Sequence, residues 1–473
     1  MSLLSDIKKM RHFDKWSLPY LMLVGFLVLV FLTGGGSRSD IQSLIILRPA
    51  ALLLLAYGIW GLTAGHVREH RFLFAMALAC LCLTALHLFP LPPTLWHSLQ
   101  GRGLLVETDV LVGNQLVWRP LTMVPSATWN ALFALVVPCA VLTLAVQLDR
   151  ERQFRLLSVL LGLGFISGLL GLMQSIGPTN GALYFYRITN EGLAVGLFAN
   201  RNHHAVFLSC MFPMLAVYAS PGERSSQKSS QKKGLRQWLS LTVAAMLIPL
   251  ILVTGSRVGL ITGAIGLLSV LWLYRFPESG GRPRRKTKNA GRLWYYLGVG
   301  GVAILVLTTA LAARAKVFDR LFASEKADEL RFRMWGPIAE MAEKYLPFGS
   351  GIGSFVEVYQ IDESLDLLQP EFVPHAHNDW LEVFLTAGLP GVVLLVASVI
   401  GYVVAARRSF RAKKQDSTDV LFGRLGVTII ALLGFASVAD YPLRTPSLVS
   451  FFVVVAIWTA NASRRLSKSA GDA

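Results

Sequence analysis

The sequence predicts an all-α integral membrane protein with about twelve transmembrane helices. The chain has 473 residues, of which 53% are hydrophobic and 15% are charged, and its mean hydropathy is +0.53. A soluble protein of this length would carry more charge. Apolar runs long enough to cross a bilayer as a helix, roughly 17 to 25 residues, recur along the whole chain.

These apolar runs alternate with polar intervals, and we expect each run to form one span. The first run begins near Trp16 and lacks a small-residue cleavage pattern, so we expect it to be retained as a span rather than removed as a signal peptide. The predicted spans are residues 17–33, 43–64, 72–91, 128–147, 156–175, 204–220, 237–254, 258–275, 294–312, 388–406, 425–440 and 446–461.

The basic residues indicate how the spans are oriented. With the N-terminus inside, the intervals assigned to the cytoplasm hold 30 of the 45 lysines and arginines, as the positive-inside rule requires. We therefore expect both termini in the cytoplasm. The net charge of +17 is concentrated in these intervals. Because no aromatic platform accompanies the basic runs, they predict contact with membrane lipids and not with nucleic acid.

The opposite face carries one long polar interval, residues 313–387, which holds 13 of the 28 acidic residues. We expect residues 1–312 to contain spans one to nine and residues 313–387 to form a large outer loop between spans nine and ten. Residues 388–473 then contain spans ten to twelve and a cytoplasmic tail.

Two elements are predicted inside this loop. The glycine-rich stretch 347–354 predicts a flexible turn whose backbone can approach a ligand closely. Before it, an apolar stripe at helical spacing predicts an amphipathic helix on the outer surface of the bundle. The stripe consists of Leu330, Met334, Ile338, Met341 and Tyr345.

The loop ends in a polar cluster, residues 374–382. Asp379 followed by Glu382, just before an apolar run, predicts a capping-box start of a helix. His377 would then lie two residues before a helix N-terminus.

Three interpretations of His375 and His377 stay open. They could be a structural pair at a helix cap. They could bind a metal together with His203, His204 or a carboxylate, although no closed spacing such as H-E-x-x-H is present. The third interpretation is a general base. A neutral imidazole near the positive end of a helix resists protonation and can take a proton from a hydroxyl at neutral pH.

Arginines at the outer ends of spans point to an anionic ligand. Arg201 and Arg257 lie on different predicted helices, and either alone could extend to the lipid headgroups. Because both arginines are expected at the same depth as the histidine cluster, they favour a site that binds a phosphate-type leaving group. The chain has no Walker A loop and no DxD-like pair for a nucleotide sugar, so we expect the donor to be carried by a lipid.

The motifs of this face occur in a characteristic order. They are Phe198-Ala-Asn-Arg-Asn-His203, Ser256-Arg257, Arg333-Met-Trp335 followed by residues 347–353, and His375-Ala-His-Asn-Asp-Trp-Leu381 with Gly388-Leu-Pro-Gly391. In their order and common face they resemble the O-antigen ligase and polymerase superfamily of bacterial envelope enzymes. The motifs cover about residues 198–391, and the twelve-span layout extends the resemblance across the chain.

The resemblance implies a metal-independent, inverting glycosyltransferase of the bacterial inner membrane that needs no cofactor. It would pass a glycan from undecaprenyl pyrophosphate to an acceptor on the periplasmic face. His377 becomes the base, with His375 as its catalytic neighbour, and Arg201 and Arg257 bind the pyrophosphate. Arg333 is a further pyrophosphate-binding candidate, at a place where the family pattern is looser. Supporting roles fall to Asn200, Asn202, His203, Ser256, Asn378, Asp440 and Arg444.

The resemblance leaves the acceptor open. Ligases of the superfamily use lipid A-core and polymerases use a second lipid-linked repeat, and we favour the ligase. The rival class is a polysaccharide or lipid transporter, which would need ionisable residues near the bilayer midplane and broken helices at corresponding positions of two halves. The sequence shows neither feature.

Overall fold

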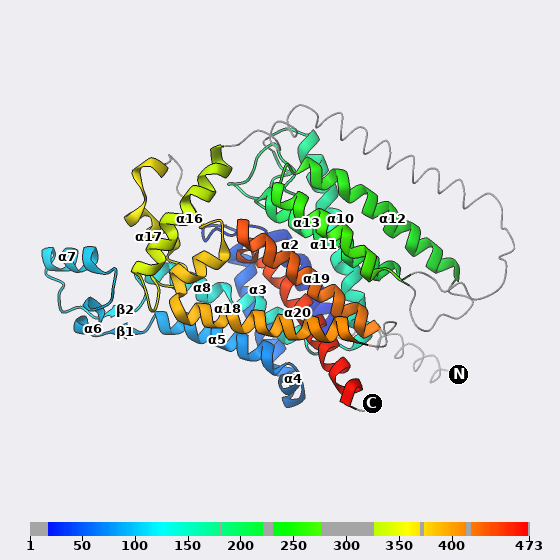
Figure 1. The fold of residues 1–473 in the computed structure, drawn as a ribbon, viewed down its shortest axis with the longest axis horizontal. Coiled ribbons are helices and arrows are strands. Elements are labelled where there is room, and N and C mark those ends of the chain that lie inside the picture. Colours follow the sequence, from blue (N-terminus) through cyan, green and yellow to red (C-terminus); the bar gives the residue numbers. More distant parts are fainter. Residues whose placement is uncertain are drawn as a thin grey trace.

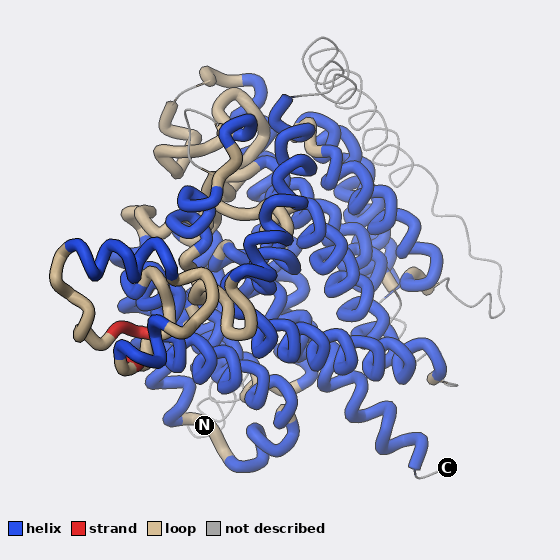
Figure 2. Tube along the Cα trace, turned by 60° about the vertical axis from the view of Figure 1, so that its left-hand side comes forward, coloured by secondary structure: helices blue, strands red, loops and turns tan. Residues whose placement is uncertain are grey.

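The computed structural model describes residues 18–179, 181–220, 230–275, 326–368, 373–412 and 418–471, and this part of the chain is mostly helical. Within it the strands form one short antiparallel pair, β1 (Pro90–Leu91) and β2 (Arg119–Pro120). The pair lies at the edge of the molecule, beside α6 (Pro93–His97) and α7 (Gly103–Leu111), as Figures 1 and 2 show.

Each predicted span that falls within the described residues coincides with a helix or a pair of helices. They are α2 (Leu18–Thr33), α3 (Leu44–Trp60), α5 (Arg71–His87), α8 (Pro125–Ala134) with α9 (Val136–Ala145), α10 (Arg150–Ile176), α11 (Arg201–Ala219), α12 (Ser230–Val253), α13 (Arg257–Leu273), α18 (Asp379–Arg411), α19 (Thr418–Ala439) and α20 (Pro446–Gly471). A short helix, α4 (Ala64–Glu69), precedes α5. The predicted span 294–312 lies outside the described residues.

Among the described residues, six helical stretches are long and apolar enough to cross a membrane. They are Pro125–Ala145, Arg150–Ile176, Gly234–Val253, Asp379–Arg411, Thr418–Ala439 and Pro446–Ser467. The helices α2, α3, α5 and α13 are apolar but shorter. The helical membrane fold is therefore confirmed, whereas the count of twelve spans stays a prediction.

The helix α11 lies at the centre of the bundle. Its residues from Asn202 to Val217 are all buried, and it packs against α10, α12, α13 and α19. The neighbouring helix α13 turns small residues towards it. A Cβ at Gly259 would lie 2.3 Å from the Cβ of Ala205, so only glycine permits this approach. Small residues at a contact allow the closest packing of helices in a membrane.

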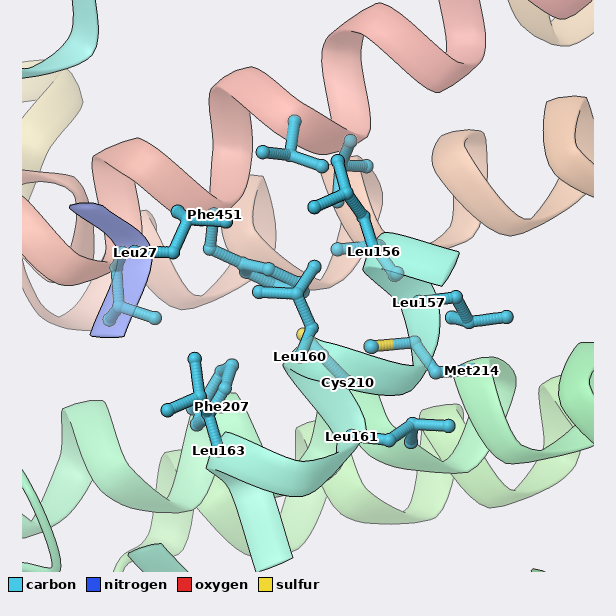
Figure 3. Packing of buried hydrophobic residues seen from close by; sticks show 14 of the residues in the cluster. Leu27, Leu156, Leu157, Leu160, Leu161, Leu163, Phe207, Cys210, Met214 and Phe451 are labelled. Atoms are coloured by element: carbon cyan, nitrogen blue, oxygen red, sulfur yellow. The ribbon is translucent and has the colours of Figure 1, made fainter. Parts of the chain in front are cut away.

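The apolar core continues around α11 with side chains from α2, α10 and α20. Figure 3 shows Leu156, Leu160, Phe207, Cys210 and Phe451 packed together in this core. All five side chains are fully buried. The centre of the bundle is thus rigid, and it fixes the ends of the helices that it joins.

A second, smaller core forms in the loop region. The predicted amphipathic helix is present as α16 (Lys326–Lys344), and Met334, Ile338, Met341 and Tyr345 of its stripe are buried. They pack with residues of α17 (Phe355–Asp362), of the 3₁₀ turn Leu365–Leu367 and of the first part of α18. Figure 1 shows α16 and α17 beside the start of α18.

The glycine-rich stretch 347–354 forms the predicted turn, and its approach to a ligand stays a prediction. It packs on a kink in α18, where Gly388 has a φ of 58° and a ψ of −150°. The kink releases carbonyl and amide groups of α18, which pair with the turn. The bonds run from the amides of Ser350 to Leu385 O (3.0 Å), Gly351 to Thr386 O (2.9 Å) and Leu389 to Pro347 O (2.8 Å).

Close approach to other parts of the chain favours glycine in this turn, since a Cβ at Gly351 would meet Thr122 and one at Gly353 would meet Ala127. A Cβ at Gly349 would lie 2.7 Å from the amide nitrogen of Gly388. Gly388 is not helical, so α18 consists of two helical segments that meet at this kink, and the turn satisfies the backbone groups that the kink frees. The predicted span 388–406 corresponds to the second of these two segments.

Candidate functional site

Four segments that are distant in sequence meet at one end of the helix bundle. They are the start of α11, the turn between α12 and α13, the residues just before α18, and the connection 440–445 between α19 and α20. Contacts between Asn202 and Asp440, between His377 and Asp440, and between Arg444 and Asp379 join three of these segments. The helices that carry them can be followed in Figure 1.

The start of α11 directs two polar side chains towards Asp440. Asn200 is the N-cap, and its side chain accepts a hydrogen bond from the amide of Asn202. The side chain of Asn202 donates to Asp440 Oδ2 at 2.5 Å, and Nε2 of His203 lies 3.5 Å from Asp440 Oδ1. Both predicted supporting residues therefore face the same carboxylate.

The turn before α13 brings the two predicted pyrophosphate-binding arginines into one region. Ser256 caps α13 by accepting a hydrogen bond from the amide of Gly259 at 2.9 Å. Gly255 has a φ of 62°, and Nη1 of Arg201 lies 3.5 Å from the position of a Cβ on this glycine. Arg201 thus reaches across to the turn that ends in Arg257, and both side chains are half-buried.

His377 lies just before α18 in an unusual backbone conformation. Its φ is 49°, and it is the one non-glycine residue with a positive φ among the described residues. This left-handed conformation is costly for a residue with a Cβ, and such strain occurs frequently at functional sites. The next residue, Asn378, is the N-cap of α18 and accepts from the amide of Leu381 at 3.1 Å.

The capping-box prediction for Asp379 and Glu382 is wrong, because Asn378 caps the helix and both acids belong to a buried network. Glu382 is 1% exposed. Its Oε1 lies 3.1 Å from His375 Nδ1 and 3.1 Å from Arg444 Nη1. Its Oε2 accepts from the amide of Ala376 at 2.9 Å, and Arg444 Nε lies 2.9 Å from Asp379 Oδ1.

This network holds the segment before α18 in place. Glu382 binds both the side chain of His375 and the backbone beside it, so the helix supports the loop that presents His377. Arg444 connects the same carboxylate to the other side of the site. Arg444 therefore pairs with two carboxylates of the protein itself, Asp379 and Glu382. Its contact with the donor or the acceptor stays a prediction.

The carboxylate of Asp440 is the electrostatic centre of the site. Its Oδ1 lies 3.7 Å from His377 Nδ1 and accepts a hydrogen bond from the Tyr441 amide at 2.9 Å. Burial works to raise the pKa of Asp440, but the facing nitrogens of His203 and His377 outweigh it and hold that pKa well below its usual range. Asp440 is therefore ionised although it is 1% exposed.

His377 is biased towards its neutral form. Burial lowers the pKa of its imidazole, while the nearby Asp440 works in the opposite direction. The cation of Arg331 adds to the lowering. A neutral imidazole beside a buried carboxylate can accept a proton, and the carboxylate then stabilises the imidazolium that forms.

Tyr441 is a site residue that the sequence did not single out. Its ring centre lies 4.3 Å from that of His375, 5.0 Å from that of His377 and 5.1 Å from that of His203. The sequence signal was weak, because Tyr441 is an ordinary aromatic residue next to Asp440. Its position among three histidines results from tertiary packing.

The two arginines of α16 lie in different surroundings. Arg333 Nη2 contacts Asp366 Oδ2 at 2.8 Å, and both side chains are exposed. Arg331 instead lowers the pKa of His377 and works to lower that of Tyr441. Residues two apart on a helix point about 200° away from each other, so only one of them faces the histidines. The role of Arg333 in binding pyrophosphate stays a prediction.

In the part of the chain that the structure describes, the histidine cluster does not form a set of converging metal ligands. No three His, Cys, Asp or Glu side chains come together there with metal-binding geometry. The donors of His375 and His377 face Glu382 and Asp440 respectively. Metal independence of the reaction itself stays a prediction.

The comparisons with known proteins agree with the motifs. Residues 241–396 match a family model described as O-antigen ligase. The match covers Arg257, Arg333, His375 and His377, whereas Arg201 and Asp440 lie outside it. A search among curated proteins finds no match. The matched region is similar to O-antigen ligases, which agrees with the resemblance of the motifs to the superfamily of O-antigen ligases and polymerases.

Proposed function

We propose that this protein is a metal-independent, inverting glycosyltransferase that moves a glycan from undecaprenyl pyrophosphate to an acceptor. The family match supports ligase-like or polymerase-type glycosyl transfer in general. The donor, the stereochemistry and an O-antigen ligase-like transfer to lipid A-core are our proposals. The donor, the acceptor and the membrane lipids are the expected partners.

The observation that carries this proposal is the placement of His377. Its imidazole faces the buried carboxylate of Asp440, at the same end of the bundle as Arg201 and the turn before Arg257. A base and two cations on one face are the groups that displacement of a phosphate leaving group requires. The strained backbone at His377 and the buried network behind it support an orientation built for reaction.

In the proposed reaction, neutral His377 takes the proton of an acceptor hydroxyl. The hydroxyl oxygen forms a bond to the anomeric carbon of the glycan, on the side opposite the pyrophosphate. The bond from that carbon to the pyrophosphate oxygen breaks, and undecaprenyl pyrophosphate leaves with the electron pair. Arg201 and Arg257 offset the charge that develops on it. Asp440 stabilises the imidazolium of His377 until the proton passes to water.

The proposal is tested with purified protein and a glycan linked to undecaprenyl pyrophosphate. Addition of acceptor should release free undecaprenyl pyrophosphate. We expect His377→Ala to reduce kcat by a factor on the order of 10² to 10⁴, the usual contribution of a general base. Retention of full transfer by folded His377→Ala would exclude the base assignment.

The two arginines have a separate test. Arg201→Ala and Arg257→Ala should weaken the use of donor more than the use of acceptor, because their guanidinium groups are proposed to bind pyrophosphate. Arg155→Ala is a matched control, since its side chain pairs with Glu151 on α10, at the opposite end of the bundle from the site. If acceptor use falls and donor use does not, the two substrate sites are reversed.

We also propose that the site faces the periplasm and that both termini lie in the cytoplasm of the bacterial inner membrane. At the opposite end of the bundle, Arg150 and Arg465 surround Asp419, as expected of a basic cytoplasmic face. In a variant without native cysteines, Asp366→Cys should react with a membrane-impermeant maleimide in cells whose outer membrane alone is permeable. Labelling that requires disruption of the inner membrane would contradict this orientation.

The acceptor can be identified separately. Deletion of the protein should leave lipopolysaccharide without its polymer if lipid A-core is the acceptor. A loss of a secreted polysaccharide with intact lipopolysaccharide would instead indicate an exopolysaccharide polymerase. In vitro, the same enzyme can be offered lipid A-core or a second lipid-linked glycan as the acceptor.

A further inference from the structure

The ring of Tyr441 is surrounded by three imidazoles from two different parts of the chain. His203 comes from α11, while His375 and His377 come from the segment before α18. All three ring centres lie within 5.1 Å of the Tyr441 ring centre, and Tyr441 is 7% exposed. The ring of Tyr441 is therefore central to the site, next to the carboxylate of Asp440.

The orientation of His377 depends on this ring. Nδ1 of His377 lies 3.7 Å from Asp440 Oδ1, which is longer than a hydrogen bond, and no other described residue supplies one to this atom. The contacts of Glu382 with His375 and with the amide of Ala376 hold the backbone next to His377, but they do not touch its imidazole. The remaining constraint is packing, and the closest aromatic partner is Tyr441.

The geometry also suits a charged imidazole. The His377 and Tyr441 ring centres are 5.0 Å apart with an interplanar angle of 56°. A cation within about 6 Å of the centre of an aromatic ring is attracted by the negative face of the ring. The proposed reaction makes such a cation when His377 accepts the proton of the acceptor.

We propose that Tyr441 is a positioning residue whose aromatic face holds His377 in place and stabilises its protonated form during glycosyl transfer. The inference rests on the proposed function of His377 as the base. It assigns the effect to the ring and not to the hydroxyl group, because the hydroxyl group has Asn200 as its hydrogen-bond partner while the ring lies among the three imidazoles.

Other charged groups also act on the His377 imidazole. Asp440, from the connection between α19 and α20, favours its protonation. Arg331 of α16 and His375 of the same segment oppose it. Because substitutions at Tyr441 leave these three residues in the chain, a change in pH dependence can be assigned to the ring if the protein stays folded.

The test compares Tyr441→Phe with Tyr441→Leu by the pH profile of kcat, measured on purified protein with donor and acceptor saturating. The acid limb of this profile is the fall of kcat towards low pH, where His377 becomes protonated. Tyr441→Phe keeps the aromatic face, so kcat should stay within about 3-fold of wild type and the acid limb should not move. Tyr441→Leu should lower kcat by roughly 10-fold or more. It should also move the acid limb to lower pH by about half a unit or more, because the imidazolium loses a favourable partner.

A merely structural role gives a different result. Loss of packing alone would reduce the amount of active protein or kcat and would leave the acid limb in place. Admission of water around His377 would move the acid limb to higher pH. Either result with Tyr441→Leu overturns the proposal, as does a Tyr441→Phe variant as inactive as Tyr441→Leu.

If Tyr441→Leu does not fold, a variant that keeps a ring of similar size at this position provides a second test. Pentafluorophenylalanine in place of Tyr441 keeps a ring of similar size but removes the negative face. It should move the acid limb in the same direction as Tyr441→Leu, and an unmoved limb would refute the role of the aromatic face.

The two proposals can fail separately. If His377→Ala is fully active, the base assignment fails, and the proposal for Tyr441 fails with it. If wild type is active and His377→Ala is not, but none of the Tyr441 variants moves the acid limb, only the role of Tyr441 is refuted.

Discussion

Glu382→Gln separates a helix cap from a buried network at the start of α18. Glutamine is as suitable as glutamate at the third position of a capping box, so a capping role predicts almost no effect. The structure instead gives Glu382 three partners. They are the ring of His375 and the guanidinium of Arg444 on one oxygen and the amide of Ala376 on the other.

The expected cost follows from these contacts. All three partners donate, and the carboxylate offers two accepting oxygens, whereas glutamine offers one oxygen and a donating NH₂. The NH₂ group of the glutamine would therefore face another donor, at a position where Glu382 is 1% exposed. Breaking a buried ion pair by removing one partner costs about 3–5 kcal/mol. Because Arg444 keeps Asp379 at 2.9 Å, we expect about 3 kcal/mol.

The free energy of unfolding can be measured by SDS titration in mixed micelles, with loss of helix as the signal. Glu340→Gln is the matched control. Glu340 is an exposed residue of α16, and its substitution should change stability by less than about 0.5 kcal/mol. The same samples should show a large loss of kcat for Glu382→Gln, because the network orients the segment that presents His377.

A small effect would refute the network. If Glu382→Gln destabilises the protein by less than about 1 kcal/mol and matches Glu340→Gln, the buried carboxylate has no special role and Glu382 acts as a cap residue. A large loss of stability with unchanged kcat would keep the network and refute its link to His377.

Three further predictions concern pH, backbone and metal. Burial lowers the pKa of His377, so kcat should be retained at pH 6.5 and lost only as the pH falls through that lowered pKa; an acid limb above 6.5 would contradict a neutral, buried base. Gly388→Ala should destabilise the protein by about 2 kcal/mol in the SDS titration, since φ is 58° and a Cβ would lie 2.3 Å from Pro347 O. The control is Gly336→Ala, where a Cβ would enter open space on α16, and it should stabilise the protein slightly. Incubation with EDTA should leave transfer intact, and a loss that Zn²⁺ restores would indicate a metal site.

Helix positions were predictable because the signal for a helix is local. An apolar run commits a segment to the bundle core or the membrane, and the stripe from Met334 to Tyr345 commits α16 to one buried face. His377 was also placed correctly relative to its helix, since α18 starts at Asp379. In each case the residues that decide the structure lie within a few turns of one another.

The features that the sequence did not predict involve partners that lie far away in the chain. Asp379 and Glu382 have the spacing of a capping box, but Arg444 pairs with both carboxylates. The glycine-rich turn 347–354 forms hydrogen bonds with backbone groups of α18 beside the kink at Gly388. Local pattern cannot include a partner that only tertiary contact brings near.

The sequence by itself determined the helical membrane fold class and named most of the residues that meet at the candidate site. Apolar length and helical period depend on near neighbours, and they are visible without a structure. Only the tertiary structure decided how these residues are connected. Asp440 meets Asn202, His203 and His377, and Tyr441 packs among three imidazoles. These contacts form because α11 and α18 begin at the place where α19 ends. That convergence results from the packing of the bundle around α11, which no single segment encodes.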